Sequence, residues 1–321
     1  MPGMLILLVV CCVVMCSVNA FVSKAKLSIN KFLIAPVRST ATTVKSPSVV
    51  KACTSLRFLE GNTWELVLGD IKVYIDPIMS QLDFGMPRLY AGNKKTIDSE
   101  KELNACAKTA DVIFISQAFD DHAHKPTLKR LARMNNNIPY LCPPGAKNIL
   151  LDCGIRESMI TTIIPGETYT FDKGVNAVEV LATMGALLGP PWAAVENGYI
   201  LKPSTYSKEK FSSIYYEPHC MYNEKELSQY KADIVITPVV AQQLPLFTLV
   251  AGGEKAVNLA KILGAKYIVP MRNGGLEQRG ILTRLVRANG SEEKFLQLAK
   301  EELGSGVEIL RAPAGETVTV P

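Results

Sequence analysis

The sequence predicts a mixed α/β fold in which much of the strand pairing is antiparallel. Short apolar strands are expected at 64–67 and 71–75, joined by Gly69-Asp70, a pair typical of a tight turn between antiparallel neighbours. Helices are expected later, inserted among further strands. No Gly-x-Gly-x-x-Gly motif is present, so the sequence gives no support to a doubly wound dinucleotide-binding sheet.

The remaining elements follow from local signals. The β-branched run 112–115 predicts a buried strand. Helices are expected at 127–134 after Pro126, at 147–153 before Gly154, at 254–263 before Gly264, and from the cap Ser291 to 303. Further strands are expected at 138–141, 175–181, 198–201, 213–216, 233–239, 267–270, 307–310 and 316–320.

The first 52 residues are predicted to be a leader. Residues 5–18 form an apolar run of 14 residues, short for a membrane span of about 20 but typical of a signal peptide, which we place at 1–20. Residues 21–52 are basic and hydroxyl-rich and contain no acid, as in a transit peptide. The folded domain is then 53–321, and no stable membrane anchor is expected after processing.

The junction Ala20-Phe21 makes the leader resemble the bipartite plastid leaders of diatoms and related algae. This resemblance implies import into the plastid, to the chloroplast stroma. The alternative is an ordinary secretory signal and a secreted protein.

The excess of basic over acidic residues in the chain comes from this leader. The whole sequence has 35 basic and 30 acidic residues, a net charge of +5. Removing residues 1–52 takes away six basic side chains, which leaves 29 basic and 30 acidic residues and a net charge of −1. A domain of this charge is not expected to bind nucleic acid. Its five cysteines contain no Cys-x-x-Cys pair, so neither a disulfide framework nor a cysteine zinc site is indicated.

All three histidines of the chain lie in two acidic segments. His122 and His124 lie in Asp120-Asp121-His122-Ala123-His124, and His219 lies in Glu217-Pro218-His219. Each segment follows a predicted strand, where sites are commonly built on a rigid scaffold. Carboxylate and imidazole are ligands that suit zinc, iron or manganese. The alternative is structural, with Asp-His hydrogen bonds that pin two loops.

The segment Ile115-Ser-Gln-Ala-Phe-Asp-Asp-His122 is similar to the Ser-His-x-His-x-Asp-His signature of the metallo-β-lactamase superfamily. Glu60-Gly-Asn-Thr-Trp64, Ile75-Asp-Pro77 and Asn197-Gly-Tyr-Ile200 resemble further parts of that family in the same order. The best match is the branch that contains ascorbate-6-phosphate lactonase. The resemblance covers about residues 54–285 and implies an αββα sandwich, with mixed sheets in the middle and helices on the outer faces.

The sequence departs from the family at several metal ligands. Gln117 and Phe119 replace the first two histidines of the signature, and Arg272 occupies the position of the last histidine. Asp121 and His122 match family positions of the second metal. A dinuclear site of the family type is therefore not expected.

Two interpretations remain open. In the first, one divalent metal, zinc or else iron or manganese, is bound by Asp121, His122 and His219. Glu217 or Asp120 is then the fourth ligand or lies just behind the ligands, and His124 is a further candidate ligand. Such a site hydrolyses a small-molecule ester, lactone or phosphoester. Asp120 or Glu217 then acts as general base, and Arg272 holds an anionic group of the substrate.

In the second interpretation no metal is bound. Arg272 neutralises the pocket by pairing with Asp121 or Glu217, because a guanidinium forms a permanently charged fork with a carboxylate. The protein is then a binding or scaffold module on a hydrolase fold.

Overall fold

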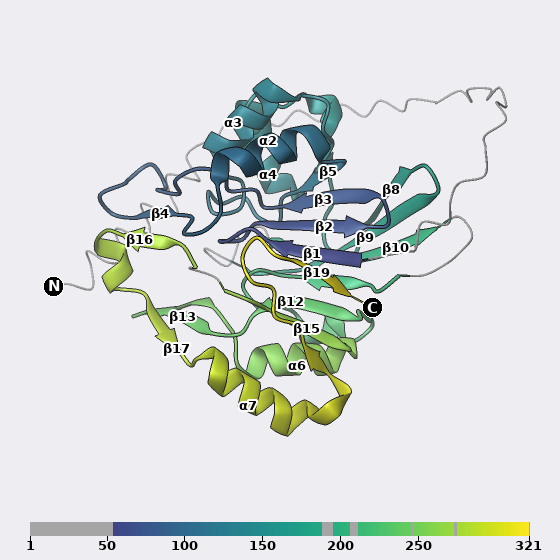
Figure 1. Ribbon diagram of the computed structural model, residues 1–321, viewed down its shortest axis with the longest axis vertical. Helices are drawn as coiled ribbons and strands as arrows, with labels where there is room; N and C mark the ends of the chain where they lie inside the picture. Colours follow the sequence, from purple (N-terminus) through teal and green to yellow (C-terminus); the bar gives the residue numbers. More distant parts are fainter. Residues whose placement is uncertain (1–53, 188–194, 206–210, 246, 273–274, 321) are drawn as a thin grey trace. The chain divides into compact units, whose positions relative to one another are not determined.

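The computed structural model describes residues 54–187, 195–205, 211–245, 247–272 and 275–320 (Figure 1). The predicted signal peptide and transit segment lie outside these residues. The described residues all belong to one compact unit, Ala52–Pro321. None of the helices in these ranges is long and apolar enough to cross a membrane.

Two large sheets form the centre of the domain, and each has seven strands within the described residues. The first has the order β19 (Thr317–Val320), β1 (Thr54–Phe58), β2 (Trp64–Leu68), β3 (Ile71–Ile75), β5 (Val112–Phe114), β6 (Tyr140–Cys142), β7 (Ile160–Thr162). The second has the order β18 (Glu308–Ile309), β15 (Tyr267–Met271), β12 (Ile234–Pro238), β11 (Ile214–Tyr216), β10 (Asn197–Thr205), β9 (Asn176–Met184), β8 (Thr168–Lys173).

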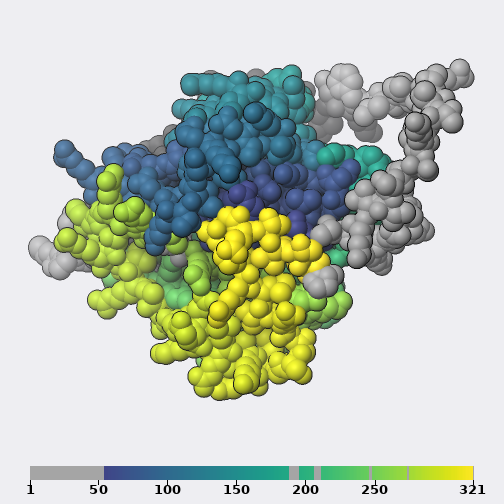
Figure 2. Space-filling view, viewed as in Figure 1, coloured from purple at the N-terminus to yellow at the C-terminus, as the bar shows by residue number. Residues whose placement is uncertain are grey.

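The two sheets pack face to face. Alternate residues of β1 and β2 are buried, and Leu56, Trp64 and Leu66 share one apolar cluster with Tyr199 and Ile236 of the second sheet. This alternation is what a strand with one face toward a core requires. The last strand returns to the first, since Val320 pairs with Thr54, and Figure 2 shows yellow C-terminal residues against purple N-terminal ones.

Helices cover the outer faces of both sheets (Figure 1). On the first sheet these are α2 (Ser99–Thr109), α3 (Lys125–Met134) and α4 (Pro144–Asp152), which bury Leu103, Leu128 and Leu150. On the second they are α5 (Glu224–Leu227), α6 (Glu254–Leu263) and α7 (Glu292–Leu303). The predicted αββα sandwich is therefore confirmed.

Smaller elements complete the domain. The short strands β4 (Ala91–Asn93) and β16 (Glu277–Arg279) pair with each other, and β13 (Ala241–Leu244) lies between β14 (Phe247–Val250) and β17 (Arg287–Asn289). Three short 3-10 helices occupy Glu157–Met159, Ile281–Arg284 and Gly304–Gly306 in the described ranges. The sequence did not predict α2. Its only strong local signal is Asp98, whose side chain accepts hydrogen bonds from the amides of Glu100 and Lys101.

The two histidine segments follow β5 and β11, which belong to different sheets. Both strands lie centrally in their sheets, so their carboxyl ends can meet between the layers. The main-chain amide of Asn197 donates to the carbonyl of Ser116 at 3.1 Å. The hydroxyl of Tyr199 donates to the carbonyl of Ile115 at 2.7 Å. These bonds attach the segment after β5 to the start of β10 and thus fix one sheet against the other.

Candidate metal centre

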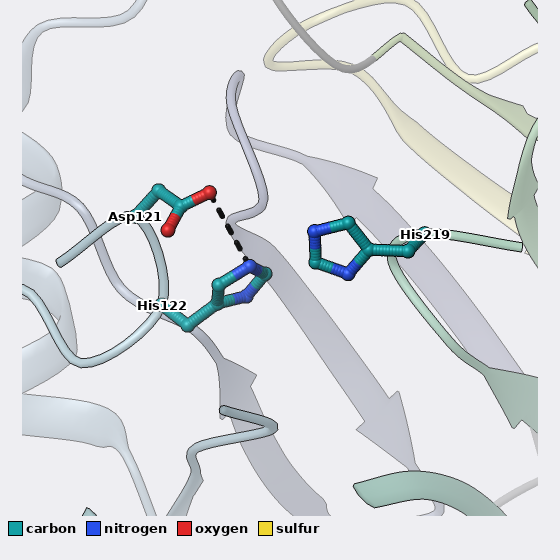
Figure 3. Close-up of side chains that lie close together, drawn as sticks. All are labelled: Asp121, His122 and His219. Atoms are coloured by element: carbon teal, nitrogen blue, oxygen red, sulfur yellow. Dashed lines mark ion pairs between the residues drawn. The ribbon is translucent and has the colours of Figure 1, made fainter. Parts of the chain in front are cut away.

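Three of the predicted ligands lie together where the two sheets meet. One donor atom each from Asp121, His122 and His219 lies within 4.8 Å of the other two. Figure 3 shows the carboxylate and both imidazole rings gathered around one space. The ring centres of His122 and His219 are 5.3 Å apart. The structure therefore brings the two loops together, and the role of these side chains as metal ligands stays a prediction.

Asp76 fixes the imidazole ring of His122 by a hydrogen bond to Nδ1. The Nδ1 atom of this fully buried ring is 2.8 Å from Oδ2 of Asp76. The same carboxylate accepts from the amide of Ser116 at 2.8 Å, from its hydroxyl at 2.5 Å and from the hydroxyl of Tyr216 at 3.0 Å. A carboxylate behind a ligand histidine fixes its ring and tautomer in metal sites. Asp76 adopts φ 46°, a left-handed conformation that aims its side chain at this group.

Charge dominates the protonation of this group. Burial lowers the pKa of His122, but the carboxylates of Asp121 and Asp76 outweigh it and raise that pKa to about 10. Burial raises the pKa of Asp121, but His122 and His219 lower it to about 2. Without a bound cation, the carboxylates therefore keep a proton on His122. A metal ion would take the place of that proton.

The second histidine is positioned by Gln117. The Nε2 atom of Gln117 lies 2.7 Å from Nδ1 of His219, while the amide oxygen of Gln117 is buried with no partner among the described atoms. Oxygen and nitrogen of an amide are assigned from such contacts. With the amide rotated by 180°, its oxygen accepts a hydrogen bond from Nδ1–H, and Nε2 of His219 is left as the free ligand atom.

The residues present fit one metal ion. Oδ2 of Asp121 is 3.4 Å from Nε2 of His122, close to the distance of about 3.4 Å between two ligands of a tetrahedral ion with bonds of about 2.1 Å. His219 is the predicted third ligand, because one of its donor atoms lies within 4.8 Å of those of Asp121 and His122. Three protein ligands leave a fourth position open, as in catalytic zinc sites. Asn62 holds this loop in place by donating to the carbonyl of Asp121 at 2.9 Å.

His124 points elsewhere. Its Nδ1 atom is 2.8 Å from the hydroxyl of Thr127, and its Nε2 atom is 3.2 Å from the carbonyl of Gln81. Burial among these neutral groups lowers the pKa of His124 to about 4. His124 is therefore not in the group formed by Asp121, His122 and His219, and its prediction as a further ligand has no support from its position. His124 supports the start of α3 through Thr127, and its partners are a hydroxyl and a carbonyl rather than the aspartate of the structural alternative.

The two predicted general bases differ in their surroundings. Glu217 is fully buried and accepts from the amides of His219 at 3.2 Å and Met221 at 2.7 Å, so it shapes the turn that carries His219. Its carboxylate is also 3.7 Å from Nδ1 of His219. Asp120 is partly exposed and lies 3.9 Å from Nζ of Lys125, and burial raises its pKa. Neither belongs to the group of three.

Arg272 lies outside this centre. Its side chain is 68% exposed and forms an ion pair of 2.6 Å with Glu292 at the start of α7. The predicted pairs of Arg272 with Asp121 or Glu217 are not among the ion pairs of the described residues, because α7 supplies a nearer acid. The proposed role of Arg272 in holding an anionic substrate group thus lacks support from its position.

Two acids near the centre were missed from the sequence. Asp76 was noted as the end of a strand and, in Ile75-Asp-Pro77, as part of the family resemblance, but it was assigned no role in the site. Glu196 is 7% exposed and accepts from the amide of Ala118 at 3.2 Å. Burial raises the pKa of Glu196 to about 7, and the charge of His122 opposes this. No local pattern marks Glu196 as unusual.

Solved structures with similar folds show low sequence identity. Igni18, a novel metallo hydrolase from the archaeon Ignicoccus hospitalis KIN4/I, has a TM-score of 0.55 at 14% identity, covering 84% of this chain and 99% of its own. An isothiocyanate hydrolase from Delia radicum gut bacteria has a TM-score of 0.56 at 15% identity, covering 82% and 98%. The diiron β-hydroxylase CmlA from Streptomyces venezuelae has a TM-score of 0.56 at 14% identity, covering 86% of this chain and 55% of its own.

These likenesses show the fold, and at such identities they show nothing of the reaction. No curated relative matches the sequence. The family model described as the beta-lactamase superfamily domain matches residues 55–272, which is most of the described chain. This match agrees with the αββα sandwich and with the ordered motifs of the sequence. The chain therefore belongs to the β-lactamase superfamily and has the metallo-β-lactamase fold.

Proposed function

We propose that the protein is a hydrolase of small-molecule esters, lactones or phosphoesters that works with one divalent metal ion. The observation that carries this proposal is the meeting of Asp121, His122 and His219 from two sheets, with Asp76 behind His122. Zinc is the expected metal, and iron or manganese suits the same ligands. The names of several neighbours, a metallo hydrolase and an isothiocyanate hydrolase among them, support a hydrolase in general terms.

A metal ion in this place would lower the pKa of a bound water and polarise the substrate oxygen. The chain itself supplies orientation and proton handling. Asp76 fixes the ring of His122, and Gln117 fixes that of His219. Glu217 holds the turn under His219 through two main-chain amides. Asp120, one of the two predicted general bases, is partly exposed and adjacent to Asp121, so it is the acid available to accept or release a proton.

A metal-free binding module is the second candidate function. It is favoured by Gln117 and Phe119, which stand where the family has its first two histidines. It is also favoured by the pairing of Asp121 with a protonated His122, which offsets the charge of one carboxylate without an ion. The two functions differ in whether the purified protein takes up metal.

The test is hydrolysis by the purified protein of a model aryl ester, a γ-lactone and an aryl phosphate, with added zinc, iron or manganese and with a chelator. We expect turnover of at least one substrate that the chelator abolishes and added metal restores. The variant His122→Ala should be inactive, and His124→Asn should remain active. Activity that survives both the chelator and His122→Ala would overturn the proposal.

We also propose that the leader directs the protein to the plastid. A fluorescent fusion of residues 1–60 should be imported into the plastid, and the Phe21→Ala variant of this fusion should remain outside the plastid. Equal import of both would remove the reason for singling out Phe21, and secretion of the fusion would favour the alternative.

A further inference from the structure

A small apolar pocket, with a volume of about 310 Å³, has Glu196 among its lining residues. Its walls come from the turn at 143–145 before α4, from Ile164 and Pro165, and from Met184 and Val195. Among the described residues that line it, Glu196 is the only ionisable one. We call this the Glu196 pocket. An apolar cavity with one convergent polar group is the usual form of a small-molecule site.

Glu196 is held in a fixed position at the edge of this pocket. Its main chain is attached at both ends, because its carbonyl accepts from Gly185 at 2.8 Å and its amide donates to Ala186 at 3.1 Å. Its carboxylate accepts from the amide of Ala118 at 3.2 Å. Ala118 is the neighbour of Gln117, which contacts His219. The Glu196 pocket is therefore joined to the candidate metal centre through two adjacent residues.

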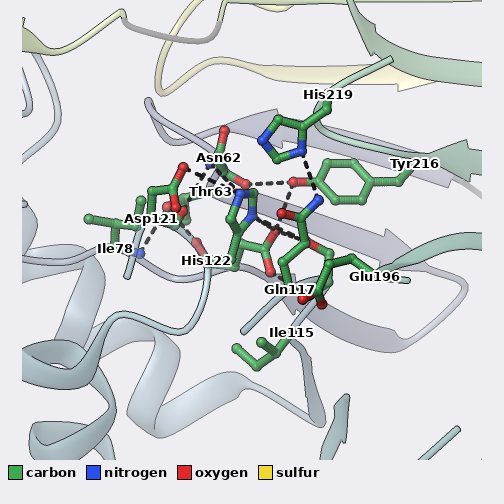
Figure 4. Close-up of polar contacts among 12 residues, drawn as sticks. Asn62, Thr63, Ile78, Ile115, Gln117, Asp121, His122, Glu196, Tyr216 and His219 are labelled. Atoms are coloured by element: carbon green, nitrogen blue, oxygen red, sulfur yellow. Dashed lines mark hydrogen bonds and ion pairs between the residues drawn. The ribbon is translucent and has the colours of Figure 1, made fainter. Parts of the chain in front are cut away.

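The carboxylate of Glu196 has no cationic partner among the described residues. The hydrogen bond that it accepts among these residues comes from the main-chain amide of Ala118. Burying a carboxylate without a cation is costly, and the cost appears here as the raised pKa of Glu196, about 7. In Figure 4 the side chain lies beside Gln117 and away from His219. A positive group brought into the pocket would remove this cost.

The surroundings also favour a cation. The candidate metal centre adds further buried or half-buried carboxylates, those of Asp76, Asp121 and Glu217. His122 is the group there whose pKa is raised, so that it carries a positive charge. Arg272, which was expected to receive an anion, points to Glu292 instead. Among the described residues that line the pocket Glu196 carries the charge, so in its ionised form it would repel an anionic ligand and attract a cationic one.

We propose that the Glu196 pocket binds an apolar group that carries a protonated amine, with the ammonium donating to the Glu196 carboxylate and the apolar part filling the pocket. In the proposed hydrolase, this group is the part of the substrate away from the bond that is cleaved. That assignment rests on the proposed function, but the binding itself does not require catalysis.

The test is a titration of the full-length protein at pH 8, where Glu196 is ionised, with three probes of one shape: benzylamine, benzyl alcohol and benzoate. Chemical shifts of the methyl groups of Ile164, Met184 and Val195 report binding in the pocket. We expect benzylamine to bind about tenfold more tightly than benzyl alcohol, the difference made by one charge-assisted hydrogen bond, and benzoate to bind least.

The variant Glu196→Gln should bring benzylamine and benzyl alcohol to within about twofold of each other. Its matched control is Glu179→Gln, which removes an exposed glutamate of β9 paired with Lys202 and should leave the preference unchanged. Equal binding of amine and alcohol by the wild type, or an unchanged preference in Glu196→Gln, would overturn the proposal. The comparison of probes on the wild type stands even if Glu196→Gln does not fold.

The same samples are assayed for bound metal and for hydrolysis, so that the two proposals can fail separately. A preference for the amine without metal uptake leaves the Glu196 pocket supported and overturns the hydrolase. Metal-dependent hydrolysis without any preference for the amine leaves the hydrolase proposal supported and overturns the proposal that the Glu196 pocket binds an amine.

Discussion

His122 and His124 are two residues apart in the chain and both are buried, yet their surroundings are opposite. His122 lies between two carboxylates, which raise its pKa to about 10. His124 lies between a hydroxyl and a carbonyl, and burial lowers its pKa to about 4. The first histidine is thus arranged to hold a positive charge or an ion, and the second is arranged to stay neutral.

The difference shows that residue type and spacing do not assign a role within this segment. The partners of His122 are Asp121 beside it and Asp76 from the end of β3. His124 instead contacts the main-chain carbonyl of Gln81, which lies five residues after Asp76 in the sequence. The fold therefore decides which histidine contacts charged groups. Substitutions of these partners test whether the two histidines differ for this reason.

The largest effect is expected from Asp76→Asn. It removes the charge behind His122 and disturbs an oxygen shared by Ser116 and Tyr216, so we expect a loss of about 3–5 kcal/mol in the free energy of unfolding. Metal affinity should fall by about 10–100-fold. The control Asp111→Asn weakens a half-exposed pair with Lys173 and should cost about 1 kcal/mol. Denaturant unfolding and metal titration measure both, and equal costs for the two variants would contradict the account.

The two histidines themselves should respond differently to substitution. His122→Asn should lose metal binding, because it removes a predicted ligand. His124→Asn should keep metal affinity within about threefold and lose about 1–2 kcal/mol of stability through its two hydrogen bonds. Isothermal titration with zinc distinguishes them. Loss of metal in both variants would show that His124 belongs to the ligand set after all.

Glu196 extends the contrast to a carboxyl that is buried without a cation. Its pKa is about 7 in the folded protein against 4.5 for an ordinary glutamate, so the folded state binds more protons between these values. Stability should therefore fall as the pH rises from 4.5 to 7. Glu196→Gln should remove this fall and stabilise the protein at pH 8 by up to about 3 kcal/mol. Parallel pH profiles of the variant and wild type from unfolding curves would contradict it.

The smallest effect is expected from Arg272→Ala. The side chain is exposed, and such pairs contribute less than about 1 kcal/mol. Neither metal affinity nor hydrolysis should change, since Arg272 pairs with α7 rather than with the metal centre. A drop of about tenfold in either property would return Arg272 to the site and restore the expectation of an anionic substrate.

Much of the fold was predictable because its signals are local. The hairpin at Gly69-Asp70, the caps at Gly264 and Ser291 and the buried run of β5 all act within a few residues. Helix α2 was missed because only four of its eleven residues are buried and one of these is Glu102. Glu102 is buried because Arg57 of β1 binds it through two hydrogen bonds, a contact between distant parts of the chain.

The site was predictable only in part. Asp121, His122 and His219 could be selected because the histidines are few and lie beside acids. Asp76 and Gln117 lie in motifs that resemble the family, but their contacts with the two histidines could not be predicted, because these contacts depend on packing between two sheets. The burial of Glu196 depends on the same packing. The position of Arg272 was inferred from the order of family motifs, and that order does not reveal that Glu292 lies within reach.

The most direct test of the metal centre is the number of metal ions bound per chain after the purified protein is saturated with zinc, iron or manganese and then desalted. The account predicts about one ion per chain for the wild type and for His124→Asn, and almost none for Asp121→Ala or His219→Asn. No metal above background in the wild type, or equal loading of His219→Asn, would contradict the central claim that the two loops form one metal centre.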